Sequence, residues 1–248
     1  MLEFPEVSVH NLHHNAAPTA ETGLALLFSA AKFVIPYDNA LRANDWRPRY
    51  EPNPSMLLQG KTALILGYGA IGQYVGKVLR AMDMLVLGVR RKHQTRSEDI
   101  DEVYALDALP NLLPQADVLI ISLPGTPETE GLIGDAELAL LPKGAVLVNV
   151  GRGSIVEAGA LFNALKTGHL RGAGLDVWYN YPTDPESRAQ TQPSDYNFHE
   201  LENVVMSPHR GGGSEDSEQL RMVHLATLLN TAVRGVPIPN RVDLIAGY

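Results

Sequence analysis

Short apolar runs alternate with amphipathic stretches through the middle of the chain. Apolar runs of strand length lie at 62–66, 84–89, 116–123, 144–150, 170–177 and 203–206. Helical patterns separate most of them, at about 70–82, 106–113, 128–141 and 157–167. Strands that are apolar throughout are typical of a parallel sheet covered by helices on both faces. The pattern therefore predicts an α/β fold built on a doubly wound, mostly parallel sheet of the Rossmann type.

The segment before this region has a different pattern. Residues 7–12 alternate between apolar and polar and predict one short strand. A helix is expected from Pro18 through the almost wholly apolar stretch 23–35, until Pro36 ends or kinks it. A helix that is apolar on most faces is buried on most faces. We therefore expect 19–35 to pack against a second copy of the chain as well as its own sheet, in a homodimer.

The first buried strand runs directly into a glycine-rich turn, Gly67-Tyr68-Gly69-Ala70-Ile71-Gly72. In a dinucleotide site Gly67 permits the tight turn, Gly69 lets the backbone approach a pyrophosphate, and Gly72 lets helix pack on strand. The helix that starts near Ala70 points its unpaired N–H groups at the phosphates. The motif alone is weak, but the strand and helix that it requires are both present. The alternative is an ordinary turn of an α/β protein.

Composition narrows the function classes. The 248 residues are 45% hydrophobic and 19% charged, as in a soluble globular protein. A net charge of -8 argues against nucleic acid or an anionic membrane as the main partner. No run approaches the ~18 apolar residues of a membrane span, and no secretory signal is visible. The absence of cysteine excludes disulfides, thiolate metal sites and a cysteine nucleophile. We expect a cytoplasmic protein without a metal site.

Ligands of such a sheet bind at the carboxyl ends of its strands. Arg90 and Arg91 follow the second strand, where an acidic residue would bind the ribose hydroxyls of NAD. Two arginines attract a 2'-phosphate instead, so NADP(H) is favoured over NAD; the alternative is a basic rim against which the adenine of NAD stacks. Arg152, Asp176 and His209 follow later strands. A guanidinium, a carboxylate and an imidazole at one edge suit redox or acid–base chemistry on a small anion.

Five motifs occur in order across essentially the whole chain. They are GYGAIG at 67–72, LPGTPETEGLI at 123–133, VNVGRGSIVEAGAL at 148–161, GAGLDVW at 172–178 and NVVMSPHRGG at 203–212. With these motifs the sequence resembles the D-isomer-specific 2-hydroxyacid dehydrogenase family. That group includes D-glycerate and phosphoglycerate dehydrogenases, glyoxylate/hydroxypyruvate reductases and formate dehydrogenase.

The resemblance implies roles for individual residues. Arg152 would bind the substrate carboxylate and polarise the C2 carbonyl, and His209 would be the acid–base. Asp176 would meet the nicotinamide amide, while Thr129 and 150–152 line the cofactor. The implied cofactor-binding set is Gly67, Gly69, Ala70, Ile71, Gly72, Arg90, Arg91, Pro124, Thr129, Val150, Gly151, Arg152, Asp176, His209 and Gly211.

The chain departs from the family in its third catalytic residue. Members carry a Glu before a Pro shortly after the LDV strand, and Tyr181 takes that position here. A phenol hydrogen-bonds an imidazole but lacks the charge that favours imidazolium. Asp184 or Glu186 would substitute if the loop folds back.

We also expect the chain to lack most of the family's first lobe. We expect residues 1–17 to be its remnant, 18–213 to be the dinucleotide-binding domain, and 214–248 to be a terminal helix and tail. Closure of such a lobe excludes water from the site. Without it, an apolar surface should be exposed where the terminal helix, 214–233, would dock.

These observations leave three hypotheses open. The leading one is an NADP(H)-preferring oxidoreductase that interconverts a small 2-oxo acid and its D-2-hydroxy acid, with Arg152, His209 and Tyr181 in catalysis. The second is a catalytically weak dinucleotide-binding module that acts through a partner or as a cofactor-linked regulator. The third is a shortened form of an ordinary enzyme of this family.

Overall fold

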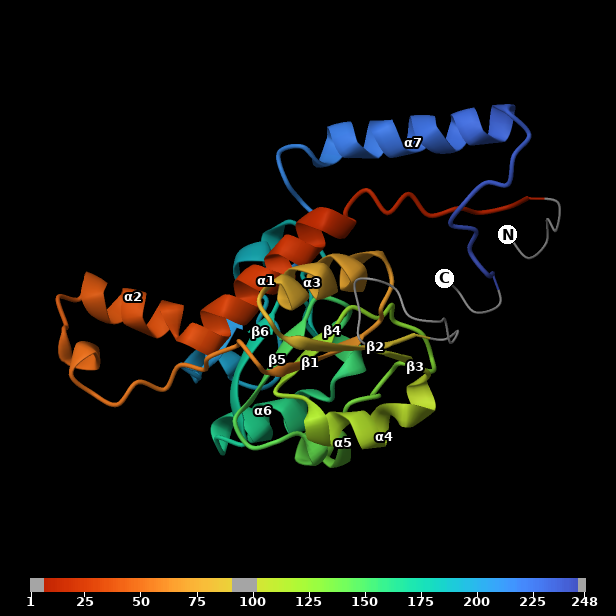
Figure 1. Ribbon diagram of the computed structural model, residues 1–248. Helices are drawn as coiled ribbons and strands as arrows, with labels where there is room; N and C mark the ends of the chain where they lie inside the picture. Colours follow the sequence, from red (N-terminus) through yellow and green to blue (C-terminus); the bar gives the residue numbers. More distant parts are fainter. Residues whose placement is uncertain (1–6, 91–101, 245–248) are drawn as a thin grey trace.

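The computed structural model describes residues 7–90 and 102–244. Within them, seven strands form one parallel sheet in the order β3-β2-β1-β4-β5-β6-β7 (Figure 1). The strands are β1 (Thr62–Leu66), β2 (Leu85–Val89), β3 (Glu102–Tyr104), β4 (Val118–Ile121), β5 (Ala145–Asn149), β6 (Leu170–Leu175) and β7 (Val204–Met206). The strand order reverses between β1 and β4, which is the topology of a doubly wound sheet. The predicted fold class is confirmed.

Helices cover both faces of the sheet. On one face lie α1 (Ala16–Lys32) and α3 (Ala70–Ala81), and on the other α4 (Leu109–Leu112), α5 (Asp135–Leu140) and α6 (Ala158–Lys166). Strand β1 shows why its sequence is apolar throughout. Leu64 and Leu66 pack into the core under α4 to α6, while Ala63 and Ile65 pack under α1 and α3, and all four are fully buried.

The long N-terminal helix breaks earlier than predicted. Helix α1 ends at Lys32, Phe33 takes a left-handed conformation (φ 54°), and α2 (Val34–Arg42) continues at a bend of 67°. Pro36 lies in the first turn of α2, where its missing N–H breaks no helical hydrogen bond. Among the described residues, no single helix meets the length and hydropathy of a membrane span; only the bent pair of α1 and α2 does so together.

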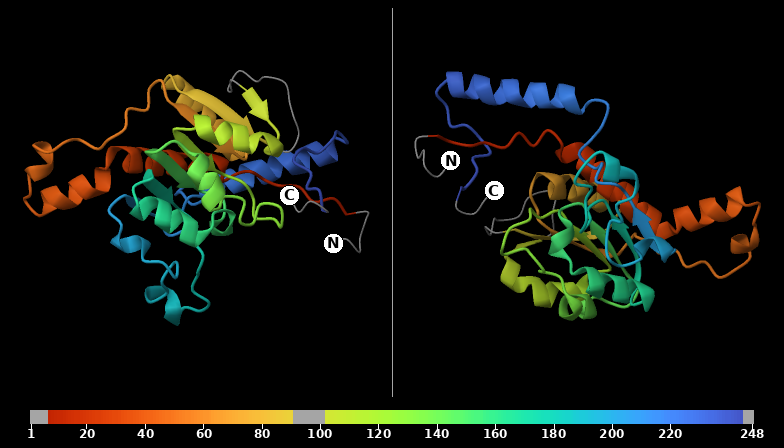
Figure 2. Two further views of the ribbon diagram at one scale, coloured as in Figure 1. Left: turned by 90° about the horizontal axis from the view of Figure 1, so that it is seen from below. Right: turned by 180° about the vertical axis from the view of Figure 1, so that it is seen from behind.

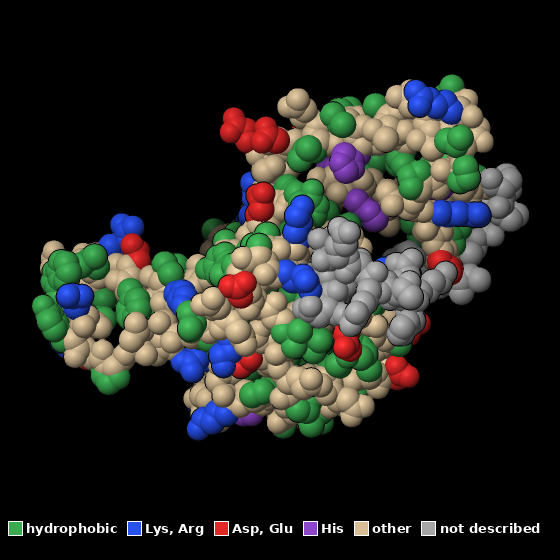
Figure 3. All heavy atoms as spheres, in the orientation of Figure 1, with side chains coloured by type: hydrophobic (Ala, Val, Ile, Leu, Met, Phe, Trp, Pro, Cys, Tyr) green, Lys and Arg blue, Asp and Glu red, His purple; other side chains and the backbone are tan. Residues whose placement is uncertain are grey.

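Most of the apolar surface of α1 is covered by the chain itself, against α3, β5 and β6. Burial of this helix therefore does not require a second subunit, which removes the sequence argument for a dimer through 19–35. The exposed apolar side chains lie further on, in an arm formed by residues 34–54 that projects from the domain (Figures 2 and 3). They are Val34, Ile35, Leu41, Trp46 and Tyr50.

Two predicted elements differ in the structure. The expected strand at 7–12 is a single antiparallel bridge between His10 and Arg241, because the segment that it pairs with forms no regular strand. The expected helix over 128–141 is reduced to α5, with turns before it. Gly131 there has a φ of 62°, and Ile133 forms a bridge with Val156, so the chain is extended where a helix was predicted.

Helix α7 (Ser217–Val233) lies apart from the sheet (Figure 1). None of its residues is buried, and Val223 and Leu229 are 56% and 58% exposed. Apolar side chains are thus exposed on the terminal helix itself, and the apolar surface expected where this helix would dock stays a prediction. The helix is tied to the N-terminal segment by His224, whose Nδ1 lies 2.6 Å from the carbonyl oxygen of Leu12. The division of the chain into 1–17, 18–213 and 214–248 stays a prediction.

Candidate active site

The glycine turn connects β1 to α3 at the carboxyl edge of the sheet. Gly67 has a φ of 97°, and a Cβ there would lie 2.8 Å from the backbone nitrogen of Leu123. At Gly72 a Cβ would lie 2.5 Å from the carbonyl oxygen of Gly67, so helix and turn touch. At Gly69 a Cβ would meet no atom within 4 Å. The N-terminus of α3, which begins at Ala70, is therefore open above Gly69, and the turn fits a pyrophosphate.

Arg90 stands beside this turn. The carbonyl oxygen of Val89, the residue before it, accepts hydrogen bonds from the N–H groups of Gly67 and Tyr68 at 3.0 and 2.9 Å. The N–H of Arg90 itself donates to Tyr104 on β3 at 3.0 Å. The end of β2 is thus attached to the glycine turn, next to the place where a ribose would follow the pyrophosphate. Arg91 lies outside the described residues.

Arg152 lies in the turn after β5, which Asn149 holds in place. The side chain of Asn149 accepts from the N–H of Gly151 at 3.0 Å and donates to the carbonyl oxygen of Arg152 at 2.9 Å. The guanidinium of Arg152 donates through Nη1 to the carbonyl oxygen of Gly151 at 2.7 Å, and its aliphatic part lies against Gly125. The sequence did not single out Asn149, although its place at the end of a buried strand was a usable signal.

The remaining predicted cofactor positions surround this turn. The hydroxyl of Thr129 donates to the carbonyl oxygen of Pro124 at 2.8 Å and accepts from the N–H of Thr126 at 2.9 Å. Thr129 is buried, so its hydrogen bonds stabilise the loop after β4 from the interior of the protein. A Cβ on Gly151 would lie 2.6 Å from the carbonyl oxygen of Leu123, which requires glycine there. The contacts of these residues with a cofactor stay predictions.

Asp176 fixes the loop that carries His209. Its side chain is 1% exposed and accepts hydrogen bonds from the N–H groups of Arg210 and Gly211 at 2.9 and 2.8 Å. The hydroxyl of Ser207 also donates to it. His209, between these contacts, has a left-handed φ of 56°, and a Cβ on Gly211 would lie 2.6 Å from the carboxylate. Asp176 is thus a positioning residue for His209; its expected contact with the nicotinamide amide stays a prediction.

Tyr181 contacts His209 directly. The hydroxyl oxygen of Tyr181 lies 2.9 Å from Nδ1 of His209 and accepts a hydrogen bond from the N–H of Trp178 at 3.0 Å. The indole N–H of Trp178 donates to the carbonyl oxygen of Ser207 at 2.8 Å. Trp178 therefore links both loops of the site, a role that no sequence motif indicated.

Neither carboxylate proposed as a substitute for the missing Glu takes its place. Asp184 accepts hydrogen bonds from the N–H of Ser187 at 2.7 Å and from the hydroxyl of Thr183 at 3.0 Å, and these contacts lower its pKa. Within the described part of the chain, no hydrogen bond joins Glu186 to His209. The loop folds so that Tyr181 is the partner of the imidazole.

Two cavities meet at Arg152 and His209. One, of about 430 Å³, is also lined by Ile71, Val150 and Asp176, and lies on the side of the glycine turn. The other, of about 520 Å³, is also lined by Trp178, Tyr179 and Tyr181.

Both cavities are also lined by residues that the sequence motifs did not predict. Asn15 and Thr19, at the start of α1, line the first. In the second, the hydroxyl of Tyr179 donates to the carbonyl oxygen of Val156 at 2.9 Å, and burial raises the pKa of this phenol. Tyr179 therefore stays neutral, and Arg152 supplies the positive charge of the second cavity.

Residues 24–211 match the family described as D-isomer specific 2-hydroxyacid dehydrogenase, NAD binding domain. The chain is 37% identical over 234 residues to a glyoxylate reductase of Aeropyrum pernix, a match that covers 91% of this chain and 66% of that protein. A probable 2-hydroxyacid dehydrogenase from Rhizobium etli, solved with NADP, superposes with a TM-score of 0.82 at 25% identity, covering 100% of this chain and 75% of that one.

An NADPH-dependent glyoxylate/hydroxypyruvate reductase from Sinorhizobium meliloti, solved with NADP and sulfate, has a TM-score of 0.79 at 25% identity, over 98% of this chain and 74% of that one. The chain spans 57 to 69% of the length of four curated relatives. Motifs, fold and comparisons agree: the chain belongs to the D-isomer specific 2-hydroxyacid dehydrogenase family, and residues 24–211 are its NAD binding domain.

Proposed function

We propose that the protein interconverts a small 2-oxo acid and its D-2-hydroxy acid with NADP(H) as preferred cofactor. The observation that carries this proposal is that Arg152 and His209 line the same two cavities, one of which adjoins the glycine turn. A carboxylate-binding guanidinium and an acid–base are thereby held next to the dinucleotide position. The relatives named as glyoxylate reductases and glycerate dehydrogenase support the same chemistry.

The substrate is held and protonated by residues of this chain. The planar guanidinium of Arg152 binds the carboxylate and places the C2 oxygen at the imidazole of His209. A bound nicotinamide supplies hydride to C2 in reduction and accepts it in oxidation. The hydroxyl oxygen of Tyr181 accepts the N–H of Trp178, and we assign to His209 the tautomer whose Nδ1–H donates to the second acceptor site of this oxygen. Nε2 is then free to give its proton to the C2 oxygen, and to take it back in oxidation.

The cofactor preference rests on Arg90 beside the glycine turn. A guanidinium there attracts the 2'-phosphate of NADP, and Arg91 adds a second positive charge. Fluorescence titration should give a lower Kd for NADPH than for NADH. The Arg90→Asp, Arg91→Ala double variant should shift the preference toward NADH, whereas Arg234→Ala, far away at the end of α7, should not. An unchanged preference in the double variant would refute the phosphate-binding role.

Steady-state assays test the activity itself. Turnover of glyoxylate or hydroxypyruvate is expected, with formate as a comparison because its oxidation needs no proton transfer. The His209→Ala variant should lose most of this activity while it still binds NADPH. Tight NADPH binding without turnover of any 2-oxo acid would favour the binding module instead. The hydrogen bond between Tyr181 and His209 supports the enzyme, because the imidazole keeps a partner despite the missing Glu. The cytoplasmic location stays a prediction.

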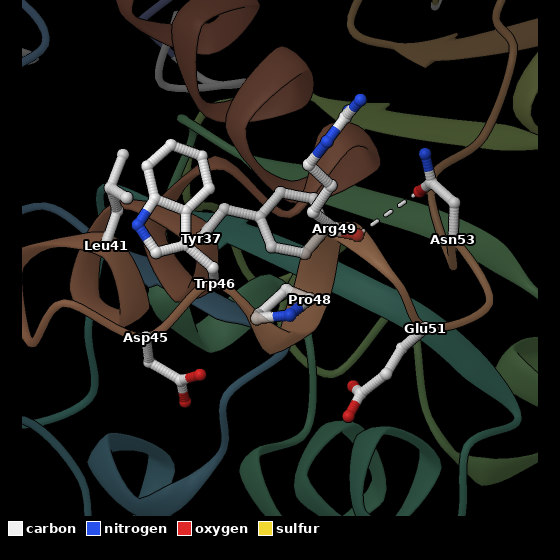
Figure 4. Close-up of a pocket in the computed structure, with 8 residues that line it drawn as sticks. All are labelled: Tyr37, Leu41, Asp45, Trp46, Pro48, Arg49, Glu51 and Asn53. Atoms are coloured by element: carbon white, nitrogen blue, oxygen red, sulfur yellow. Dashed lines mark hydrogen bonds between the residues drawn. The ribbon is translucent and has the colours of Figure 1, made fainter.

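The homodimer is proposed through the arm at 34–54. Trp46 and Tyr50 are 60% and 81% exposed, and Trp46 lines a cavity of about 340 Å³ together with Tyr37 and Leu41 (Figure 4). Tyr37 donates to Asn53 at 3.2 Å across the arm, which keeps its two sides together. Exposed aromatic side chains of this kind favour an interface.

Sedimentation tests the dimer. A dimer is expected for the wild type, and Trp46→Asp should give a monomer. Val223→Asp, at a similarly exposed apolar position on α7, should remain dimeric. A wild-type protein that sediments as a monomer at every concentration would overturn the dimer.

A further inference from the structure

Another cavity, of about 590 Å³, lies beside the proposed active site. Its lining includes Trp178, Tyr181 and His209, which also line the active-site cavity of about 520 Å³. The Tyr181–His209 pair is thus a wall common to both spaces. On its far side the new cavity is bounded by Met206 and by the loop that carries Arg188. We call this space the distal groove.

The distal groove is held in shape by backbone contacts. The carbonyl oxygen of Pro193 accepts hydrogen bonds from the N–H groups of Tyr179 and Asn180 at 3.1 and 3.0 Å, which closes the loop on itself. Trp178 is fixed to the carbonyl oxygen of Ser207, as described above. A ligand would therefore meet a preformed space of the size that small-molecule sites have.

The walls are largely apolar, and they carry one permanent charge. Met206 and three prolines, Pro182, Pro193 and Pro208, contribute apolar surface next to Trp178. Arg188, in the short 3-10 helix Glu186–Ala189, is the cationic side chain of the lining. Over residues 7–90 and 102–244, its guanidinium forms no ion pair and no hydrogen bond, and the nearby carboxylate of Asp184 is occupied by Ser187. The charge is available to an anionic group.

We propose that the distal groove binds the side chain of the substrate, and that this substrate is a 2-oxo or 2-hydroxy acid whose apolar chain ends in a second carboxylate. The inference rests on the proposed function, since it starts from a C2 oxygen at His209. The side chain of such an acid extends past the Tyr181–His209 pair into the distal groove. Its methylene groups lie against Trp178 and Met206, and its distal carboxylate binds Arg188. Glyoxylate, which has no side chain, does not reach the groove.

Three substrates separate these contacts: glyoxylate, 2-oxohexanoate and 2-oxoadipate, the last two having equal chains without and with a second carboxylate. For the wild type, kcat/KM should be highest with 2-oxoadipate. Arg188→Met should lower kcat/KM for 2-oxoadipate by about tenfold, through KM, because a charge-assisted contact is lost. Values for glyoxylate and 2-oxohexanoate should stay within about twofold. Arg234→Met, at an exposed arginine directly after α7, should change none of the three.

A binding measurement separates this inference from the proposed activity. The chain has two tryptophans, so Trp46→Phe leaves Trp178 as the only one, at the wall of the groove. Titration with 2-oxoadipate should change its emission, and adding Arg188→Met should raise the Kd about tenfold. The same effect of Arg188→Met on binding without any turnover would support the groove while the proposed function fails. Turnover of glyoxylate with 2-oxoadipate binding unaffected by Arg188→Met would overturn the groove and leave the function intact.

Discussion

The hydroxyl oxygen of Tyr181 lies 2.9 Å from Nδ1 of His209, at the place where a carboxylate stands in the family pattern. The phenol fixes the ring by a hydrogen bond, as a carboxylate does, but adds no negative charge. The backbone N–H of Trp178 donates a hydrogen bond to the same hydroxyl oxygen, so Tyr181, the partner of His209, is itself held in place. In this protein Tyr181 therefore orients the imidazole of His209 without supplying the negative charge that would favour imidazolium.

Two substitutions of Tyr181 should therefore have different effects, because one removes the hydrogen bond and the other adds a negative charge. Tyr181→Phe removes the hydrogen bond to Nδ1 and should lower kcat/KM about tenfold, with NADPH binding unchanged. Tyr181→Glu places a carboxylate beside the ring and favours imidazolium, the proton donor in reduction. The alkaline limb of kcat/KM for 2-oxo acid reduction should then move up by about one pH unit or more. pH profiles of the three proteins check this; a limb that stays in place in Tyr181→Glu contradicts the assignment of His209.

The glycine turn gives a matched pair of variants. Gly69→Ala adds a Cβ in open space at an ordinary φ of -95°, so the free energy of unfolding should change by no more than about 0.5 kcal/mol. The methyl group would stand where a pyrophosphate approaches, and the Kd for NADPH should rise at least about tenfold. Gly72→Ala places its Cβ 2.5 Å from a carbonyl oxygen and should destabilise the fold by about 1–3 kcal/mol. Denaturant unfolding and fluorescence titration measure both; equal NADPH binding by Gly69→Ala and wild type would argue against the pyrophosphate site.

Much of this arrangement could be predicted from local sequence. The strands are buried on both faces, so their apolar runs identified the parallel sheet directly. Because parallel strands bring their carboxyl ends to one edge, the chain positions of Arg152 and His209 were enough to expect them together.

Other features depend on contacts between distant segments. The break at Phe33 and the role of Trp178 follow from packing that periodicity does not contain. The segment 128–141 has a helical pattern, yet the bridge from Ile133 to Val156 keeps part of it extended. The sequence left open whether Tyr181 or Asp184 would meet His209, and only the folded loop decides that the phenol, and not the carboxylate, reaches the imidazole.

Asp176 should matter for stability and for activity together. Its buried carboxylate accepts the N–H groups of Arg210 and Gly211 on different oxygens. Asp176→Asn keeps the shape but loses one acceptor and the charge, which leaves a buried N–H unpaired and should cost about 1–3 kcal/mol. His209 lies in the loop that this carboxylate holds, so kcat/KM should fall as well.

The exposed Asp184 provides the comparison for this variant. Asp184→Asn should leave both the midpoint of denaturant unfolding and kcat/KM close to those of the wild type. If Asp176→Asn were equally stable and active, the loop would be held by other contacts.

Histidines between α7 and the N-terminal segment predict a response to acid, and Figure 3 shows histidine side chains gathered there. Burial and, to a smaller extent, nearby His224 lower the pKa of His13 below its ordinary value of 6.5. His13 therefore binds a proton less tightly when the N-terminal segment is packed than when this segment is detached. The stabilising contribution of His13 is complete above pH 6.5 and is lost as the pH falls below it.

Amide hydrogen exchange measures this loss of packing. Exchange of α7 and of the segment around Leu12, whose carbonyl oxygen meets His224, should speed up relative to the sheet as the pH falls below 6.5, after correction for intrinsic rates. His13→Asn, with a residue that tolerates the left-handed φ of 54°, should flatten this dependence. His199→Asn, on the 3-10 helix Phe198–Glu200, removes an exposed histidine elsewhere and should leave it unchanged. Equal pH dependence in the wild type and His13→Asn would mean that another group loosens α7.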